Sequence, residues 1–377
     1  MKITNKIFIA VLFSTLVSPT IFGQWSFGLS TEQEYNDNPF RSKLAEKAFV
    51  SSFSGNAGYD FDFLKVGYAG SLISFDVLPE RNFYWHQAAA WMEFESSSLG
   101  ISFEQRLNKD IYTYFDYDNF SLYYNQQIEL QNFHITLAPY TSFTQYKSIP
   151  ILDNLQTSLS ATVNRGFETG TTVILGGALN YKRYTSPIQS GTYSYLDETN
   201  TLVTETYRDK NVSSVTQVLA FARVAQSITG TTGLATQFTN RSILSGFGAF
   251  VKDLNVVYGD ESEMFDDPVN YEGNNFSVEL TQILFDDLQI KAGYYLNNKN
   301  YPSQGIYDEL LSYNTGLMRS DTQSIFNLSV KKNISLDSAN GLNLSVGLNY
   351  QMINNKSNSY LFDYKSNSIN LNLGFEL

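Results

Sequence analysis

The chain has 377 residues and a formal net charge of -12, which excludes a nucleic-acid partner because such a partner would require a basic surface. It has no cysteine, which excludes disulfides, thiol chemistry and a lipidated N-terminal cysteine. Aromatic residues make up 15% of the chain, a share that fits side chains placed at membrane–water interfaces.

Residues 1–23 have the three-part layout of a secretory signal peptide. Two lysines precede an apolar run over residues 7–17, and the segment ends at the small residue Gly23. The alternative is a retained anchor helix, but the apolar run is well short of the ~20 residues that span a bilayer. We therefore expect cleavage after Gly23, which leaves residues 24–377 as one mature domain.

After the leader, segments of roughly ten residues alternate apolar and polar side chains as far as the C-terminus. A period of two sends alternate side chains to opposite faces, as in a transmembrane β-barrel with a lipid face and a polar interior. The sequence predicts an all-β antiparallel barrel of sixteen strands, within a range of 14–18, near 24–35, 47–61, 63–76, 83–95, 99–108, 119–130, 132–146, 154–165, 171–184, 212–228, 234–243, 273–284, 287–298, 322–333, 341–352 and 360–377.

The connections between these segments alternate in length, which favours a barrel over an aromatic-rich secreted β-sandwich. Short turns are expected near 62, 96–98, 131, 168–170, 229–233, 285–287 and 336–340. Longer links are expected at 36–46, 108–119, 185–211, 244–272, 299–321 and 353–359, with shorter ones at 76–82 and 147–153. Barrels have short periplasmic turns and long external loops, so both termini should face the periplasm.

Parity assigns the two faces of each strand. Leu155, Leu159 and Val163 share the outward parity, whereas Gln156 and Ser158 share the inward one. The inward sets of several strands are rich in Asn, Gln, Ser and Thr, which are typical of a hydrated lumen. A barrel of about sixteen strands is wide enough for an aqueous channel unless a loop folds inward.

Charged residues are scarce on the predicted strands, and parity points most of them inward. Charge on the lipid face would cost ~2–4 kcal/mol at the midplane, so the inward assignment is also the cheaper one. Two interpretations stay open: the charges create a transverse field that selects solutes, or they pair and solvate the wall. The lumen-lining candidates are Glu93, Glu95, Glu104, Arg106, Glu129, Lys182, Arg223, Arg241, Glu279, Lys291 and Lys331.

Two loop segments carry distinct chemistry. Residues 253–272 contain six carboxylates, but their spacing does not match a calcium-binding loop, so a solvated acidic loop is favoured over a cation site. Residues 246–251 combine glycines with aromatic and small side chains. The sequence leaves open whether this segment constricts the lumen or packs over the barrel mouth.

The chain offers little for catalysis. Its only histidines are His86 and His134, and neither is accompanied by a nucleophile motif such as G-x-S-x-G. A hydrogen-bonded interfacial histidine is favoured over a catalytic one at both positions. The sequence contains no metal triad, Walker loop or dinucleotide fingerprint, so we expect no enzyme activity and no cofactor or metal site.

The leader and the closing segment with Leu371, Leu373, Phe375 and Leu377 resemble those of the outer-membrane β-barrel (porin-like) superfamily of Gram-negative bacteria. The ending is similar to the assembly signal that the barrel-insertion machinery reads, although family members usually end on an aromatic residue. The resemblance covers residues 24–377 and implies an outer-membrane location with lipid and that machinery as partners. Alternation begins at Trp25, which disfavours a receptor with an N-terminal plug domain.

These observations predict a passive outer-membrane channel for small hydrophilic solutes, with selectivity set by lumen width and wall charge. The alternative is a plugged or closed barrel that anchors surface or secretion partners through its loops. A barrel lipid hydrolase or protease is a distant third. The solute, the exact strand count and a homo-oligomeric assembly stay open at this point.

Overall fold

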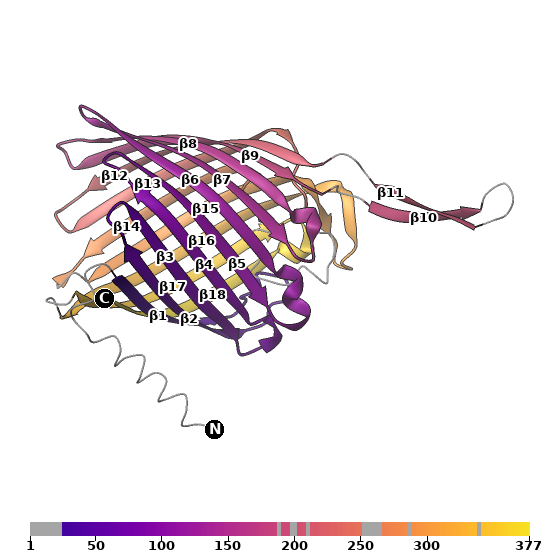
Figure 1. Cartoon of the computed structure of the whole chain (residues 1–377), viewed down its shortest axis with the longest axis horizontal. Coiled ribbons are helices and arrows are strands. Elements are labelled where there is room, and N and C mark those ends of the chain that lie inside the picture. Colours follow the sequence, from indigo (N-terminus) through magenta and orange to yellow (C-terminus); the bar gives the residue numbers. More distant parts are fainter. Residues whose placement is uncertain are drawn as a thin grey trace, which may run out of the picture.

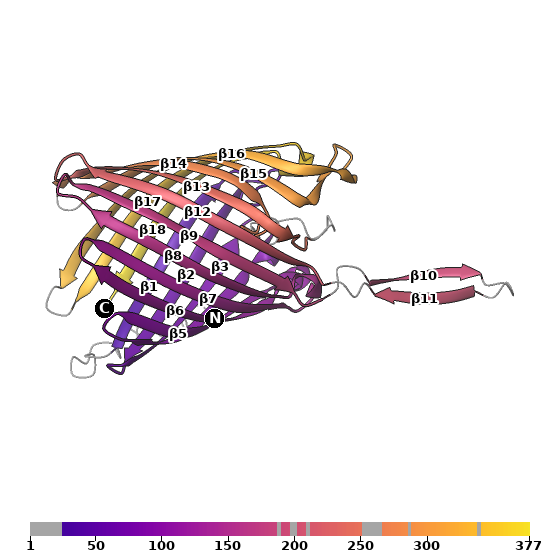
Figure 2. The ribbon, with the colours of Figure 1, turned by 90° about the horizontal axis from the view of Figure 1, so that it is seen from above.

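The structure is a computed structural model that describes residues 25–186, 190–196, 202–208, 212–250, 266–285, 288–337 and 341–377. The predicted leader, residues 1–23, lies outside this part of the chain. Sixteen strands close into one antiparallel barrel (Figure 1 and Figure 2). In the described ranges, no helix is long and apolar enough to cross a membrane.

The sixteen predicted strands are confirmed, because each overlaps one strand of the barrel. Around the barrel the order is β1, β18, β17, β16, β15, β14, β13, β12, β9, β8, β7, β6, β5, β4, β3 and β2. The strands are β1 (Trp25–Asn36), β2 (Ala48–Asp60), β3 (Leu64–Phe75), β4 (Phe83–Glu93), β5 (Ser97–Asn108), β6 (Tyr117–Leu130), β7 (Phe133–Tyr146), β8 (Asn154–Gly166), β9 (Thr171–Tyr184), β12 (Ser214–Ser227), β13 (Thr232–Gly246), β14 (Glu272–Ile283), β15 (Gln289–Tyr307), β16 (Tyr313–Asp337), β17 (Leu342–Ser357) and β18 (Tyr364–Glu376).

The barrel closes between its first and last strands. Gly28 of β1 lies opposite Glu376 of β18 in an antiparallel register. The N–H of Phe27 donates to the carbonyl of Leu377 at 3.0 Å, and the N–H of Leu377 donates to the carbonyl of Phe27 at 2.9 Å. Every barrel strand is then paired on both edges, so no open row of unsatisfied backbone groups faces the lipid.

The connections alternate between short turns at one end and longer loops at the other, as the sequence predicted. The C-terminus lies at the turn end (Figure 1). Asp62 and Gly170 lie in two of the turns with φ of +69° and +74°. Positive φ is common in tight turns, where glycine or a short polar residue adopts it at little cost.

The sequence prediction of a long loop over 299–321 was wrong. β15 continues to Tyr307 and β16 begins at Tyr313, so the two strands extend as a hairpin and only residues 308–312 turn. The predicted loop over 185–211 also contains a two-stranded sheet, β10 (Ser190–Leu196) and β11 (Leu202–Arg208), which projects from the loop end (Figure 2). Strands beyond the lipid need no apolar face, so the apolar alternation ends before the pairing does.

The two faces of the wall differ as predicted. On β8, the apolar side chains of Leu155 and Leu159 are 40% and 55% exposed, on the face that lipid would cover. The intervening Gln156 and Ser158 have the opposite parity, and Gln156 lies in register with Lys182 of β9. The polar residues of the sequence pattern therefore line the interior of the barrel.

Apolar side chains mark the turn end of the outer face. Phe61, Phe94, Phe167 and Phe285 lie at four of the turns, and all four are exposed. The guanidinium of Arg165 lies 4.8 Å from the ring centre of Phe167. Rings and snorkelling cations at this height fit an interfacial girdle, with the turns close to the membrane surface.

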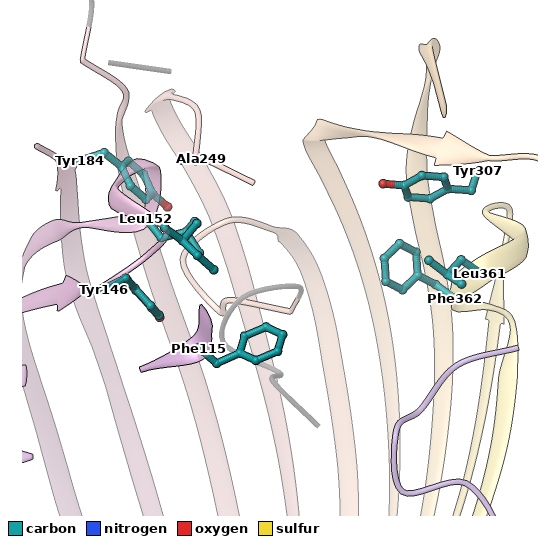
Figure 3. Packing of buried hydrophobic residues seen from close by; sticks show 9 residues of the cluster. Phe115, Tyr146, Leu152, Tyr184, Ala249, Tyr307, Leu361 and Phe362 are labelled. Carbon is teal, nitrogen blue, oxygen red and sulfur yellow. The ribbon is translucent and has the colours of Figure 1, made fainter. Parts of the chain in front are cut away.

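The loop end carries the main apolar core. Tyr307 packs against Tyr313 at 4.9 Å between ring centres, and Tyr313 packs against Phe250 at 5.6 Å. Fully burying a large apolar side chain contributes about 1.5–3 kcal/mol, so the loops stabilise one another at the barrel mouth. This mouth cluster (Figure 3) consists of Phe115, Tyr146, Ile149, Leu152, Tyr184, Ala249, Tyr307, Leu361 and Phe362.

Several loops are closed by the same kind of hydrogen bond. The N–H of Phe75 donates to Asn82 Oδ1 at 2.8 Å, and the N–H of Tyr146 donates to Asp153 Oδ1 at 2.7 Å. Each acceptor immediately precedes the next strand, so one side chain ties two strand ends together. Burial raises the pKa of the Asp153 carboxyl group, which fits its position beneath the loop.

Candidate functional site

The interior of the barrel is the candidate functional site. All of the predicted lumen-lining residues except Glu95 lie on strands and alternate with the exposed apolar side chains of the outer face. They are Glu93 on β4, Glu104 and Arg106 on β5, Glu129 on β6, Lys182 on β9, Arg223 on β12, Arg241 on β13, Glu279 on β14, Lys291 on β15 and Lys331 on β16.

The assignment of Glu95 to the wall was wrong. β4 ends at Glu93, and the N–H of Phe94 donates to the carbonyl of Ser97 at 2.8 Å to close the turn. Glu95 is exposed within this turn. Parity holds only while the strand continues, so it could not place a residue beyond the strand end.

Inward charges of opposite sign gather on opposite sides of the barrel. Strands β1 and β4 to β6 carry most of the inward carboxylates, and β9 to β16 carry most of the inward cations. β1 and β9 lie half a circuit apart in the strand order. The acidic arc contains Glu32, Glu34, Glu93, Glu104 and Glu129, and the basic arc contains Lys182, Arg223, Arg241, Lys291, Lys299, Arg319 and Lys331.

Each arc also holds a few charges of the other sign, of which Glu279, Asp321 and Lys65 form local ion pairs. Arg223 Nη2 lies 3.0 Å from Glu279 Oε2, and the Tyr295 hydroxyl donates to Glu279 at 2.6 Å. On the acidic side, Lys65 Nζ lies 2.6 Å from Glu93 Oε2. Each such ion pair neutralises one minority charge together with one charge of the arc. The other charges of each arc still have predominantly one sign.

Two basic side chains of the arc remain exposed. Lys291 and Lys331 are both exposed, and neither forms an ion pair with any residue in the described part of the chain. Lys331 lies opposite Gln289 in the register, two residues from Lys291, so the two cations lie diagonally on adjacent strands. Their positive charge faces the lumen without a partner among the described residues.

The described end of the acidic loop is not a free solvated segment. Asp267 accepts from Lys182 Nζ at 2.5 Å, and Asp266 pairs with Lys299. The amide of Gln217 on β12 donates to the carbonyl of Pro268 at 2.7 Å. For Asp266 and Asp267 the prediction of a solvated loop was therefore wrong, because wall cations far away in the sequence neutralise them.

Residues 266–271 form what we call the strap, which is attached to the inner side of β9, β12 and β15. Asn270 of the strap donates to the Tyr184 hydroxyl at 2.9 Å. Among the described residues, no group of three His, Asp or Glu side chains gathers as a metal ion would require. The other predicted carboxylates of this loop, at 253, 260, 261 and 263, lie outside the described residues.

The glycine-rich segment packs at the mouth of the barrel. Ala249 is 3% exposed and belongs to the mouth cluster, and the Phe250 ring contacts Tyr313. Gly248 lies so close to Asn270 that a Cβ atom there would overlap its side chain. Of the two alternatives for 246–251, packing over the mouth describes residues 246–250, and Val251 lies outside the described residues.

A buried ion pair fixes the hairpin of β15 and β16. Arg319 and Asp321 are 3% and 2% exposed, with a 2.5 Å contact between Nη2 and Oδ2. The guanidinium also lies 3.6 Å from the ring centre of Phe362 and donates to Gln304 at 3.1 Å. This network connects the hairpin to the loop before β18.

We expect Arg319→Met to destabilise the hairpin by about 3–5 kcal/mol, because Asp321 would remain as a buried unpaired charge. Limited proteolysis of the membrane-embedded protein checks this, with faster cleavage within residues 301–319 as the expected result. The double variant Arg319→Met/Asp321→Leu removes both charges and should recover most of the protection. Equal cleavage of the wild type and the single variant would contradict the prediction.

Neither histidine lies in a catalytic arrangement with a serine in the described part of the chain. His86 has outward parity on β4, and its Nδ1 lies 2.7 Å from the Tyr68 hydroxyl. His134 Nδ1 lies 3.6 Å from Glu129 near the turn end. The His86 contact matches the hydrogen-bonded histidine that the sequence favoured, whereas the contact of His134 is longer than a hydrogen bond.

Aromatic rings cover glycines on the inner wall. A Cβ atom built on Gly176 of β9 would lie 2.6 Å from the ring of Phe221, and one on Gly100 of β5 would lie 2.3 Å from the ring of Tyr123. Each ring therefore lies over its glycine, against the wall. This arrangement keeps large side chains out of the centre of the lumen.

Comparison with known proteins identifies the fold of this chain through solved structures. No family model matches the sequence, and no curated protein matches it. Solved structures do match over nearly the whole barrel. The chain has the porin β-barrel fold. Its likeness to Pseudomonas aeruginosa OccD3 (OpdP) has a TM-score of 0.53 at 11% identity and covers 95% of this chain and 92% of that one.

Two further porin structures give similar values. Acinetobacter baumannii OccAB1 matches with a TM-score of 0.53 at 9% identity, over 94% of this chain and 96% of that one. Pseudomonas aeruginosa OpdK, solved with vanillate, matches with a TM-score of 0.50 at 9% identity, over 94% and 98%. At these identities the likeness establishes the shared porin fold.

Sequence reasoning missed several inward charges. Glu32 and Glu34 lie in a predicted strand at the inward parity, so the signal for them was present in the alternation. Lys299, Arg319 and Asp321 lie in the region predicted as a loop, where no parity was assigned. Their roles became visible only with the extended hairpin.

Proposed function

We propose that this protein is a passive channel for small hydrophilic solutes in the outer membrane of a Gram-negative bacterium. The observation that carries the proposal is a closed barrel whose interior is polar and whose acidic and basic arcs face each other. Opposed charges create a transverse field that orders water and orients polar solutes. The porin fold of the solved relatives supports this class of function and a non-enzymatic role.

The route to the membrane belongs to the same proposal. Residues 1–23 would be removed as a signal peptide, and the segment with Leu371, Leu373, Phe375 and Leu377 would be read by the barrel-insertion machinery. The turn end with both barrel termini would then face the periplasm.

Planar-bilayer recording of the refolded protein is the test of the channel, with a heat-modifiability gel to establish that the barrel has formed. The expected result is stepwise ohmic conductance, because a sixteen-stranded barrel leaves room for water inside. A folded barrel that stays electrically silent would contradict the channel.

A second candidate function is favoured by the loop end. The mouth cluster and the strap narrow the outer opening, and β10 and β11 project beyond it, as a barrel that anchors external partners would require. The same recording separates the two functions, since a silent barrel is the outcome that the anchoring function predicts. In that case deletion of residues 187–211 should abolish capture of a partner without loss of folding.

A further inference from the structure

The inner wall also carries aromatic side chains, which belong to neither the acidic nor the basic arc. Trp91 of β4 lies opposite Gly100 of β5, Gly100 lies opposite Tyr123 of β6, and Tyr123 lies opposite Tyr140 of β7. All four residues have inward parity. Trp91, Tyr123 and Tyr140, which we call the aromatic row, therefore follow one line of the register on the inside of the barrel.

Two rings of the row lie against glycines of neighbouring strands. A Cβ atom built on Gly67 of β3 would lie 3.6 Å from the Trp91 ring, and one on Gly100 would lie 2.3 Å from Tyr123. The Tyr123 ring thus lies over Gly100 of the preceding strand, which supports one face of the ring and leaves the other towards the lumen, whereas the outer edge of the Trp91 ring lies beside Gly67. The indole N–H of Trp91 donates to Glu93 at 3.1 Å and holds that ring in position.

Hydroxyl and amide groups adjoin the row. The Tyr140 hydroxyl lies 3.0 Å from Ser121 Oγ, and Ser121 donates to Asn119 Oδ1 at 2.8 Å. Beyond Tyr140 the same line of the register continues through Ser158 of β8 and Asn180 of β9. Along this line the aromatic rings are therefore succeeded by side chains that can donate hydrogen bonds to hydroxyl groups and accept them.

The line of the register through the row runs from the turn end of the barrel towards the loop end. Trp91 lies two residues from the turn end of β4, Tyr140 lies near the middle of β7, and Asn180 lies four residues from the loop end of β9. The strands are tilted, so a line across them rises from one rim towards the other. A solute that follows this line would pass from one end of the channel towards the other.

We propose that the aromatic row binds neutral solutes that contain a six-membered ring with one flat C–H face and hydroxyls at its rim, which is the chemistry of a pyranose sugar. The face of an aromatic ring is apolar and carries negative charge density, so it attracts a flat C–H surface. The row lies on the acidic arc, whose carboxylates without an ion pair in the described residues, such as Glu104, disfavour ring-shaped carboxylates. This inference rests on the proposed channel and names its class of solute.

The test is equilibrium binding of maltotriose to the refolded variant Trp25→Phe/Trp85→Phe in detergent, followed by the fluorescence of Trp91, the remaining tryptophan of the sequence. Sorbitol is the comparison solute, because it has the hydroxyls of a sugar and no ring. The expected result is a saturable change with maltotriose and none with sorbitol. An equal response to sorbitol, or tighter binding of benzoate than of maltotriose, would overturn the proposal.

Variants separate the row from the rest of the lumen. Tyr123→Leu/Tyr140→Leu keeps apolar bulk but removes two ring faces, and it should weaken maltotriose binding roughly tenfold. Phe221→Leu on β12, three strands beyond β7 in the barrel order, is the matched control and should leave the affinity unchanged. Equal losses in both variants, or no loss in either, would refute the role of the row.

Binding in detergent does not depend on passage through the membrane. A silent barrel that still binds maltotriose through the row would refute the channel and retain the binding site. A conducting barrel with no sugar binding would refute the site and retain the channel. The two proposals therefore fail separately.

Discussion

Replacing both Lys291 and Lys331 with glutamate is expected to shift the ion preference of the channel towards cations by about tenfold. A unit charge ~12 Å from an ion in water contributes about 0.35 kcal/mol. Reversing two charges changes the interaction by four such contributions, about 1.4 kcal/mol or tenfold. Both lysines are exposed, on inward positions, without an ion-pair partner in the described part of the chain. Loss of either side chain therefore leaves no buried charge uncompensated.

The measurement is the reversal potential across a bilayer in a KCl gradient, before and after the double substitution. Lys356→Glu is the matched control, because it makes the same charge change on an exposed outward position of β17. The control should leave the reversal potential unchanged, since its charge is separated from the lumen by the barrel wall. An unchanged potential in the lumen variant would mean that the basic arc does not govern permeation.

The substitution Gly176→Ala is expected to lower single-channel conductance by roughly a quarter, because it displaces one aromatic ring into the lumen. The added methyl group would lie 2.6 Å from the ring of Phe221, and the side chain of Thr162 lies 2.9 Å away on the other side. The ring is the part that can move, and the open space is on the lumen side.

The second-site variant Gly176→Ala/Phe221→Ala tests this explanation. Without the ring, the added methyl group has nothing to displace, so conductance should return to the wild-type level or above it. Gly166→Ala provides a neutral comparison, because no atom lies within 4 Å of a Cβ atom at that position. A double variant that conducts as poorly as the single variant would show that the methyl group acts by another route.

Much of the barrel wall could be predicted from the sequence, because its signal is local. Alternation along a strand decides which side chains share a face, as Leu155 and Gln156 illustrate, and this needs no knowledge of distant segments. The inward parity of Lys291 and Lys331 follows from the same rule. Alternation gives no information where a strand has left the lipid or has ended. The hairpin of β15 and β16 was therefore predicted as a loop, and Glu95 was assigned to a strand that ends before it.

The partners of the charged residues could not be predicted in this way. Lys182 and Asp267 are separated by 85 residues, and Arg223 and Glu279 by 56. Which of them meet depends on barrel closure and on the path of the loops, and neither is encoded in a local pattern. The sequence therefore predicted a solvated acidic loop, although lysines of the barrel wall form ion pairs with its described carboxylates.

The sequence by itself predicted a barrel of about sixteen strands, the face on which most side chains of the wall lie and the polar character of the interior. These features follow from a period of two and from the cost of placing polar groups against lipid. Only the tertiary structure decided that the acidic and basic arcs oppose each other, that the strap is attached to the inner wall and that Trp91, Tyr123 and Tyr140 form one row. Those arrangements depend on strand order, register and tilt, which bring together residues that no local pattern connects.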